Sequence, residues 1–90
     1  MSNFGKCTVV VEGNAVKHVN DFLLPLCGKS DEYVYARSFN VQAKLVDEVL
    51  YVNFESNWDL ELLDKIIEIC EGKSGRYYYN YYKVRIILIY

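Results

Sequence analysis

Segments with strand periodicity and segments with helical periodicity follow one another along this chain in an order that few folds accommodate. Residues 7–13 (CTVVVEG) are largely β-branched and end in glycine, which predicts a strand. Apolar residues then recur at helical spacing as far as Leu26, and Pro25 limits that helix because a proline disfavours helical geometry in the residue before it. Further along, the patterns predict strands at residues 33–46 and 48–56, a helix at 57–72 and a last strand at 76–90.

This order predicts the ferredoxin-like split βαββαβ arrangement. It is an α+β fold in which a four-stranded antiparallel sheet carries two helices on one face. We expect a single domain over residues 1–90, because a chain of this length has little room for a second core. Asp47 and Glu48 are the expected turn between two strands that pair as a hairpin, and the strand at 33–46 has an expected break near Ser38.

Composition and charge narrow the classes of function. The hydrophobic content of 52% suits a globular chain, and the net charge of −2 supplies no global basic field that would attract nucleic acid. No segment approaches the roughly 18 apolar residues of a membrane span, and the first twenty residues lack the apolar run of a signal peptide. We therefore expect a cytoplasmic protein that makes no membrane contact.

Catalytic and metal-binding signatures are missing from the sequence. Cys7, Cys27 and Cys70 are odd in number and widely spaced, so we predict reduced thiols that behave as small hydrophobic residues. His18 is the only histidine, which leaves little to build a catalytic triad or a metal site. We predict no catalytic residues, no metal, no cofactor and no enzymatic activity.

Six of the nine tyrosines fall in the last segment, RYYYNYYKVRIILIY. If Val84, Ile86 and Leu88 face the helices, alternation along the strand places the opposite set on the open face of the sheet. We predict a partner-binding surface there, joined by one residue of the neighbouring hairpin; its members are Tyr77, Tyr79, Tyr81, Lys83, Arg85 and Tyr51. A bulge or turn at Asn80 would reverse this assignment.

Other roles for these tyrosines stay open. Aromatic residues favour strands and stabilise sheets through cross-strand pairs, so a purely structural role competes with recognition. Aromatic residues beside Lys and Arg on an open sheet face also suit RNA or single-stranded DNA, although GRYYYNYY lacks the signature order of the RNA-recognition motif. A homodimer that buries the last strands or the sheet faces is a third interpretation, so the expected state is a monomer or a homodimer.

Two short segments resemble the YubB-type ferredoxin-like domains of phages and plasmids. They are Cys7–Gly13, which fits an early Cys-x-[LV]-x-[VI]-x-G strand, and Phe54–Trp58, which fits an aromatic-x-[ST]-x-W sequence before a helix. The resemblance implies an origin in a phage or mobile element, and no catalytic residues. Small phage proteins of this kind often occlude a surface of a host protein or nucleoprotein complex, as anti-CRISPR and other anti-defence inhibitors do, which is our expectation for this chain.

Overall fold

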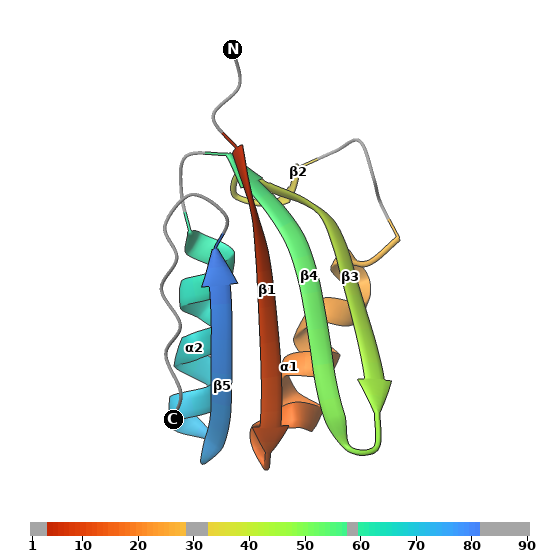
Figure 1. The fold of residues 1–90 in the computed structure, drawn as a ribbon, viewed down its shortest axis with the longest axis vertical. Helices are drawn as coiled ribbons and strands as arrows, with labels where there is room; N and C mark the ends of the chain where they lie inside the picture. The colour runs from red at the N-terminus through yellow and green to blue at the C-terminus, as the bar shows by residue number, and fades with distance from the viewer. Residues whose placement is uncertain (1–3, 29–32, 58–59, 82–90) are drawn as a thin grey trace.

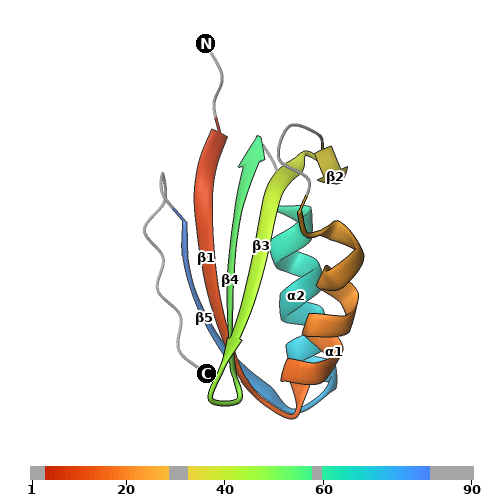
Figure 2. The same cartoon turned by 90° about the vertical axis from the view of Figure 1, so that its right-hand side faces the viewer.

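In the described part of the chain, five strands form one antiparallel sheet, and two helices cover one of its faces (Figures 1 and 2). The structure is a computed structural model that describes residues 4–28, 33–57 and 60–81. The elements are β1 (Phe4–Gly13), α1 (Ala15–Leu23), the 3₁₀ turn η1 (Leu24–Leu26), β2 (Tyr33–Tyr35), β3 (Ser38–Val46), β4 (Val49–Asn57), α2 (Glu61–Gly72) and β5 (Gly75–Tyr81). The strand order is β2-β3-β4-β1-β5.

The α+β prediction is confirmed, but the predicted number of four strands is wrong. The fifth strand arises where we expected only a break in one long strand. Ala36 takes a positive φ of 52° and a turn follows through Arg37, so the chain reverses and β2 pairs with β3 as a short hairpin. Tyr33 lies opposite Phe39 in this hairpin. A reversal of two residues therefore turns a predicted single strand into two.

The turn between β3 and β4 is confirmed at Asp47 and Glu48. Both residues have positive φ values, 49° and 67°, and Val46 pairs directly with Val49. Two consecutive residues with positive φ are the mark of a type I′ turn, whose twist matches that of the flanking strands. The β3–β4 hairpin is consequently long and regular at this end of the sheet, where it projects beside α1 (Figure 1).

The second helix starts later than its sequence pattern suggests. We predicted a start at Asn57, whereas β4 continues to Asn57, which pairs with Phe4, and α2 begins at Glu61. Glu61 and Asp64 then stand in the first helical turn, where carboxylates interact favourably with the positive end of the helix dipole. Strand pairing at Asn57 thus overrides the predicted start of the helix there.

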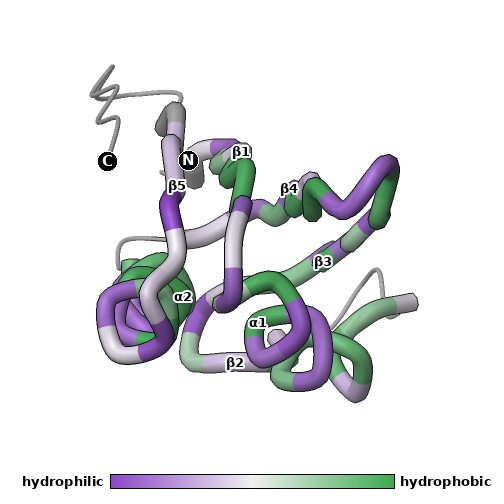
Figure 3. Tube along the Cα trace, turned by 90° about the horizontal axis from the view of Figure 1, so that it is seen from below, coloured by the Kyte–Doolittle hydropathy of each residue, from purple (hydrophilic) through white to green (hydrophobic). Residues whose placement is uncertain are grey.

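The core lies between the helices and one face of the sheet. In β1, Cys7, Val9 and Val11 are at most 1% exposed and point toward the helices, while Thr8 and Val10 alternate with them on the other face. From α2, the buried residues are Leu62, Leu63, Ile66 and Cys70. Figure 3 shows the same division in α2, where the hydrophilic segments lie on the side away from the sheet. The other face of the sheet carries no described helix.

Candidate functional site

The predicted orientation of the last strand is wrong. Tyr77 is 2% exposed and belongs to the hydrophobic core, and Tyr79 packs against that core. The pairing of β5 with β1 explains why: Tyr77 lies opposite Val11 and Tyr79 opposite Val9, and both valines point toward the helices. Because directly paired residues share a face, the two tyrosines lie on the helix-covered side and cannot serve as open-face contacts.

The rest of the predicted surface divides into three cases. Tyr81 pairs with Cys7 through its backbone, and its side chain is outside the described part of the chain. Lys83 and Arg85 lie outside the described residues altogether. Tyr51, by contrast, is 43% exposed on β4 and does stand on the open face. One predicted side chain therefore remains at the surface on which the prediction placed it.

Tyr77 and Tyr79 instead build the wall of the core beside α2. Their ring centroids are 6.3 Å apart and their planes differ by 15°, so the rings stack along the strand. The register between β1 and β5 continues without a shift from Gly75 to Tyr81, so the bulge considered at Asn80 does not occur within the described strand. The prediction was reversed because it was anchored on Val84, Ile86 and Leu88, which the structure does not describe.

A row of side chains crosses the open face at the level of Tyr51. Tyr51 lies opposite Lys44 of β3 and Val10 of β1, and Val10 in turn lies opposite Tyr78 of β5. Val46 and Val49 form the pair next to the hairpin turn, two positions along from Lys44 and Tyr51, and therefore lie on the same open face. We name this surface the tyrosine patch; its members are Val10, Val46, Val49, Tyr51 and Tyr78. It joins apolar area from four strands on the face without a described helix.

Sequence reasoning missed Tyr78, although a signal for it exists. Arg76 and Asn80 are polar and flank Tyr78 at two-residue spacing, which is typical of the solvent face of a strand. An alternation anchored on these two residues would have placed Tyr78 outward and Tyr77 inward. The valine positions in β1 give the same answer once the register is known.

Tyr78 is held in place by a hydrogen bond across the sheet. Its hydroxyl donates to Oε2 of Glu12 on β1. This hydrogen bond is the main cause that raises the pKa of Tyr78 above its ordinary value, and partial burial adds to it, while nearby Arg76 acts in the opposite direction. The ring is consequently a fixed apolar surface with its polar tip already satisfied, and rigid rings of this kind lose little entropy when a partner binds.

At the level of Asn53 and Glu55, the open face is polar and largely paired within itself. Thr8 Oγ1 donates to Asn53 Oδ1 at 2.9 Å, and Asn40 Nδ2 donates to Glu55 Oε2 at 3.0 Å. A small hollow of about 120 Å³ lies beside these pairs. Because its hydrogen-bonding groups are mostly engaged, this region offers a partner less than the tyrosine patch does.

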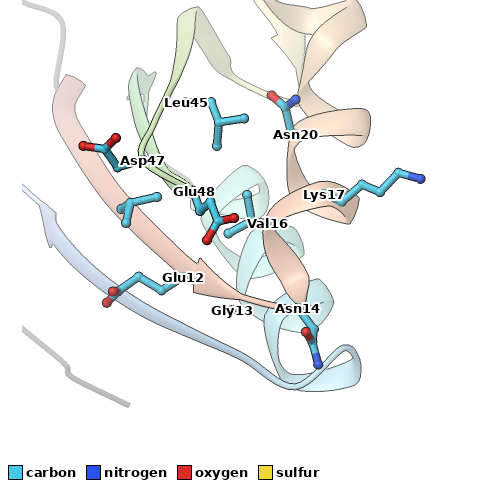
Figure 4. Close-up of a pocket in the computed structure, with 10 residues that line it drawn as sticks. Glu12, Gly13, Asn14, Val16, Lys17, Asn20, Leu45, Asp47 and Glu48 are labelled. Carbon is cyan, nitrogen blue, oxygen red and sulfur yellow. The ribbon is translucent and has the colours of Figure 1, made fainter.

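A larger groove of about 700 Å³ lies at the hairpin end of the molecule, between α1 and the β3–β4 hairpin (Figure 4). Its apolar lining comes from Val16, Leu45 and Val49. Its charged and polar lining comes from Glu12, Asn14, Lys17, Asn20, Asp47 and Glu48. The groove is therefore mixed in character, with three carboxylates against one ammonium group.

The described side chains do not assemble a recognisable catalytic or metal-binding group. Within residues 4–28, 33–57 and 60–81, no three His, Cys, Asp or Glu side chains gather as ligands for a metal ion. His18 is exposed on α1. Burial raises the pKa of the Cys7 thiol to about 12, and burial together with Glu71 raises that of Cys70 to about 11. Both thiols are held in the unreactive protonated form.

Cys27 differs from the two buried cysteines and should be the most reactive thiol. It is half-buried, and although burial raises its pKa, a hydrogen bond from the backbone of Ala43 works against that rise. We expect iodoacetamide at about pH 8 to modify Cys27 at least about tenfold faster than Cys7 or Cys70 in the folded protein. Peptide mass spectrometry of a labelling time course measures the three rates. Equal rates in the folded protein, rather than only after denaturation, would contradict the burial of Cys7 and Cys70.

Comparisons with known proteins do not indicate a function for the chain, so the function has to be inferred from the geometry of the site. No known family, curated protein or solved structure matches the chain. Neither of the helices that the structure describes is long and apolar enough to cross a membrane.

Proposed function

We propose that this chain is a non-enzymatic protein-binding domain that acts by occluding a surface of a host protein. The tyrosine patch carries the proposal. It combines exposed Tyr51 and anchored Tyr78 with three valines on a sheet face without a described helix. Charged side chains at its margin, among them Lys44, Arg76 and Asp47, form the polar rim typical of protein interfaces.

The proposed arrangement is ferredoxin-like with an added edge strand. The four long strands have the order β3-β4-β1-β5, and the two helices lie on one face, so the opposite face carries no described helix. The resemblance of Cys7–Gly13 and Phe54–Trp58 to YubB-type domains supports an origin in a phage or mobile element. On that basis we propose a cytoplasmic anti-defence role in the host cell, of the kind performed by anti-CRISPR inhibitors.

Nucleic acid binding has less support than protein binding. Two of the tyrosines considered as stacking platforms, Tyr77 and Tyr79, face the helices, which leaves Tyr51 and Tyr78 as the described rings of the tyrosine patch. Glu12 and Glu48 stand near the same surface and would repel phosphate. Protein recognition uses tyrosine without requiring a basic field, so it accounts better for an open face that bears both signs of charge.

Substitution of Tyr51 tests the proposal. We expect Tyr51→Ala to lower the affinity for the captured partner about thirtyfold, because an interface hot spot contributes about 2 kcal/mol or more to binding. Immobilised wild type captures partners from a bacterial lysate, and each captured protein is purified and titrated against the variant. Tyr33→Ala is the matched control, since Tyr33 is 57% exposed but lies on β2, at the other end of the sheet.

The same titration separates the competing functions. If a partner binds wild type and Tyr51→Ala equally well, the tyrosine patch is not the surface that binds it. Tight binding of RNA or single-stranded DNA that weakens steeply with salt, measured by fluorescence anisotropy, would favour the nucleic acid alternative. A stable dimer of wild type that Tyr51→Ala dissociates, measured by light scattering, would show that a second copy covers the patch.

A further inference from the structure

Among the residues that the structure describes, no strand pairs with the outer edge of β3 along about half of its length. β2 pairs with β3 only at Ser38 and Phe39, near one end. From Gln42 to Val46, no strand in the described part of the chain lies beside β3 on that side, and Figure 1 shows β3 at the margin of the sheet there. An edge of this kind presents backbone amide and carbonyl groups to which another strand can pair.

The register identifies which backbone groups point outward. The two-residue turn makes Val46 and Val49 a pair joined by hydrogen bonds, and such pairs alternate along an antiparallel ladder. Lys44 therefore directs its amide and carbonyl toward β4, while Ala43 and Leu45 direct theirs outward. The hydrogen bond from the Ala43 backbone to Cys27, a residue outside the sheet, agrees with this geometry. The Ala43 amide is thereby directed toward Cys27, and Leu45 is the next position whose amide and carbonyl point outward.

The side chain of Leu45 is also free for contact. It is 54% exposed and lines the groove of about 700 Å³ together with Val16 of α1. Figure 4 shows Leu45 pointing into the space between the hairpin and α1. A strand added beside Leu45 would place every second side chain on this side of the sheet, where Leu45 and Val16 provide apolar contact.

The charges around the groove indicate the chemistry of the added strand. Asp47 and Glu48 form the turn at the end of β3, and Glu12 lies across from them. Lys17 is the one cation among the lining residues, and Figure 4 shows its ammonium group directed away from these carboxylates. A segment with a lysine or arginine near the hairpin turn would complement them, whereas an acidic segment would be repelled.

We propose that the edge of β3 at Leu45 binds an extended, basic segment of a partner protein by strand addition. The segment's backbone pairs with the outward amide and carbonyl of Leu45. Its alternate aliphatic side chains enter the groove beside Leu45 and Val16, and its basic side chain meets Asp47 and Glu48. This inference goes beyond the proposed function, because it concerns the outer edge of β3 and the helix-covered side of Leu45, which adjoin the tyrosine patch only at Asp47 and Val49.

A model peptide tests the proposal without knowledge of the natural partner. The probe is a fluorescein-labelled octapeptide of alternating valine and arginine, and binding to the full chain is followed by fluorescence anisotropy. We expect the same peptide with glutamate in place of arginine to bind at least about tenfold more weakly. We expect a comparable loss when alternate backbone amides of the probe are methylated, because methylation removes the donors that strand addition needs.

Variants of the protein locate the binding edge. Leu45→Pro removes the outward amide yet leaves the hydrogen bonds to β4, so we expect at least about tenfold weaker probe binding. Leu45→Val keeps the amide and should bind the probe as wild type does. The double variant Asp47→Asn with Glu48→Gln should bind the basic probe more weakly than wild type does. The double variant Asp64→Asn with Glu71→Gln makes the same change in net charge on α2 and should bind the probe as wild type does.

Three results would overturn the proposal. These are equal binding of the basic and acidic probes, unchanged binding to Leu45→Pro, and a wild-type dimer that Leu45→Pro converts to a monomer, since a second copy would then occupy the edge. If Leu45→Pro does not fold, the methylated probe takes its place, and unchanged binding of the methylated probe would overturn the proposal. Tyr51→Ala should bind the probe normally, so failure at the tyrosine patch and failure at this edge remain distinguishable.

Discussion

Replacing Tyr77 by alanine is expected to lower the free energy of unfolding by about 3–5 kcal/mol, the range found when large aromatic side chains are removed from cores. Tyr77 is 2% exposed, lies opposite the fully buried Val11, and stacks on Tyr79. Its removal leaves a cavity between the sheet and α2 that neighbouring residues cannot fill without moving. Urea unfolding followed by circular dichroism measures the change.

Tyr51→Ala is the matched control for Tyr77→Ala. The same atoms are removed from a strand, but Tyr51 is 43% exposed and faces away from the helices. Its loss should change the free energy of unfolding by no more than about 1 kcal/mol. Equal losses for the two variants would contradict the orientation of β5. Because domains of this size are stable by about 5–15 kcal/mol, Tyr77→Ala should also unfold at markedly lower temperature.

This difference governs how binding experiments on the tyrosine segment should be read. A variant that replaces Tyr77 and Tyr79 removes core side chains, so its failure to bind a partner would report loss of folding. Tyr51→Ala and Tyr78→Phe change the open face instead. They are the appropriate variants for testing recognition, since Tyr78→Phe removes only the hydroxyl that donates to Glu12.

Replacing Gly75 by alanine should destabilise the protein by about 3 kcal/mol, at the upper end of the range usual for overpacking. A Cβ atom on Gly75 would stand 2.3 Å from the Cβ of Ala15 and 3.3 Å from the carbonyl oxygen of Glu12. Ala15 is fully buried at the start of α1, so neither group can withdraw as a flexible side chain would. Thermal and urea unfolding measure the loss.

Two variants isolate the cause of this effect. Gly72→Ala, at the end of α2, meets no atom within 4 Å and should be neutral or stabilising by up to about 1 kcal/mol. Ala15→Gly removes the atom with which the new Cβ collides. The double variant Ala15→Gly with Gly75→Ala should therefore lose less stability than the two single changes sum to. Strict additivity would mean that the collision is not the source of the destabilisation.

Sequence reasoning succeeded where a local interaction decides the structure. The Asp47–Glu48 turn joins two alternating strands, and a turn of two residues leaves one register for the hairpin. The burial of Leu63, Ile66 and Cys70 in α2 likewise agrees with the helical periodicity of that segment, which did not indicate the burial of Leu62. The reversal at Ala36 was less predictable, because positive φ at alanine is unfavourable and is accepted only where surrounding contacts compensate for it.

The candidate surface could be predicted only in part. Tyr51 was placed correctly because its neighbours Leu50 and Val52 are clearly apolar and mark the inward side of β4. β5 has no aliphatic residue that marks its inward side, since tyrosine occupies both alternating sets, and its one guide is the polar pair Arg76 and Asn80 beside Tyr78. A phenol ring suits a core position and a surface position about equally well, so composition cannot decide between them.

The succession of the four long strands and the two helices, the hairpin turn and the inward face of β4 were therefore determined by the sequence alone, since each rests on residues close along the chain, whereas the reversal that separates β2 from β3 was not. The orientation of β5 was decided by its pairing with β1, a strand more than sixty residues earlier, which sets Tyr77 against Val11 and Tyr78 against Val10. Alternation divides a strand into two sets of side chains, and where tyrosine occupies both sets, the register with a neighbour of known orientation fixes which set meets the core.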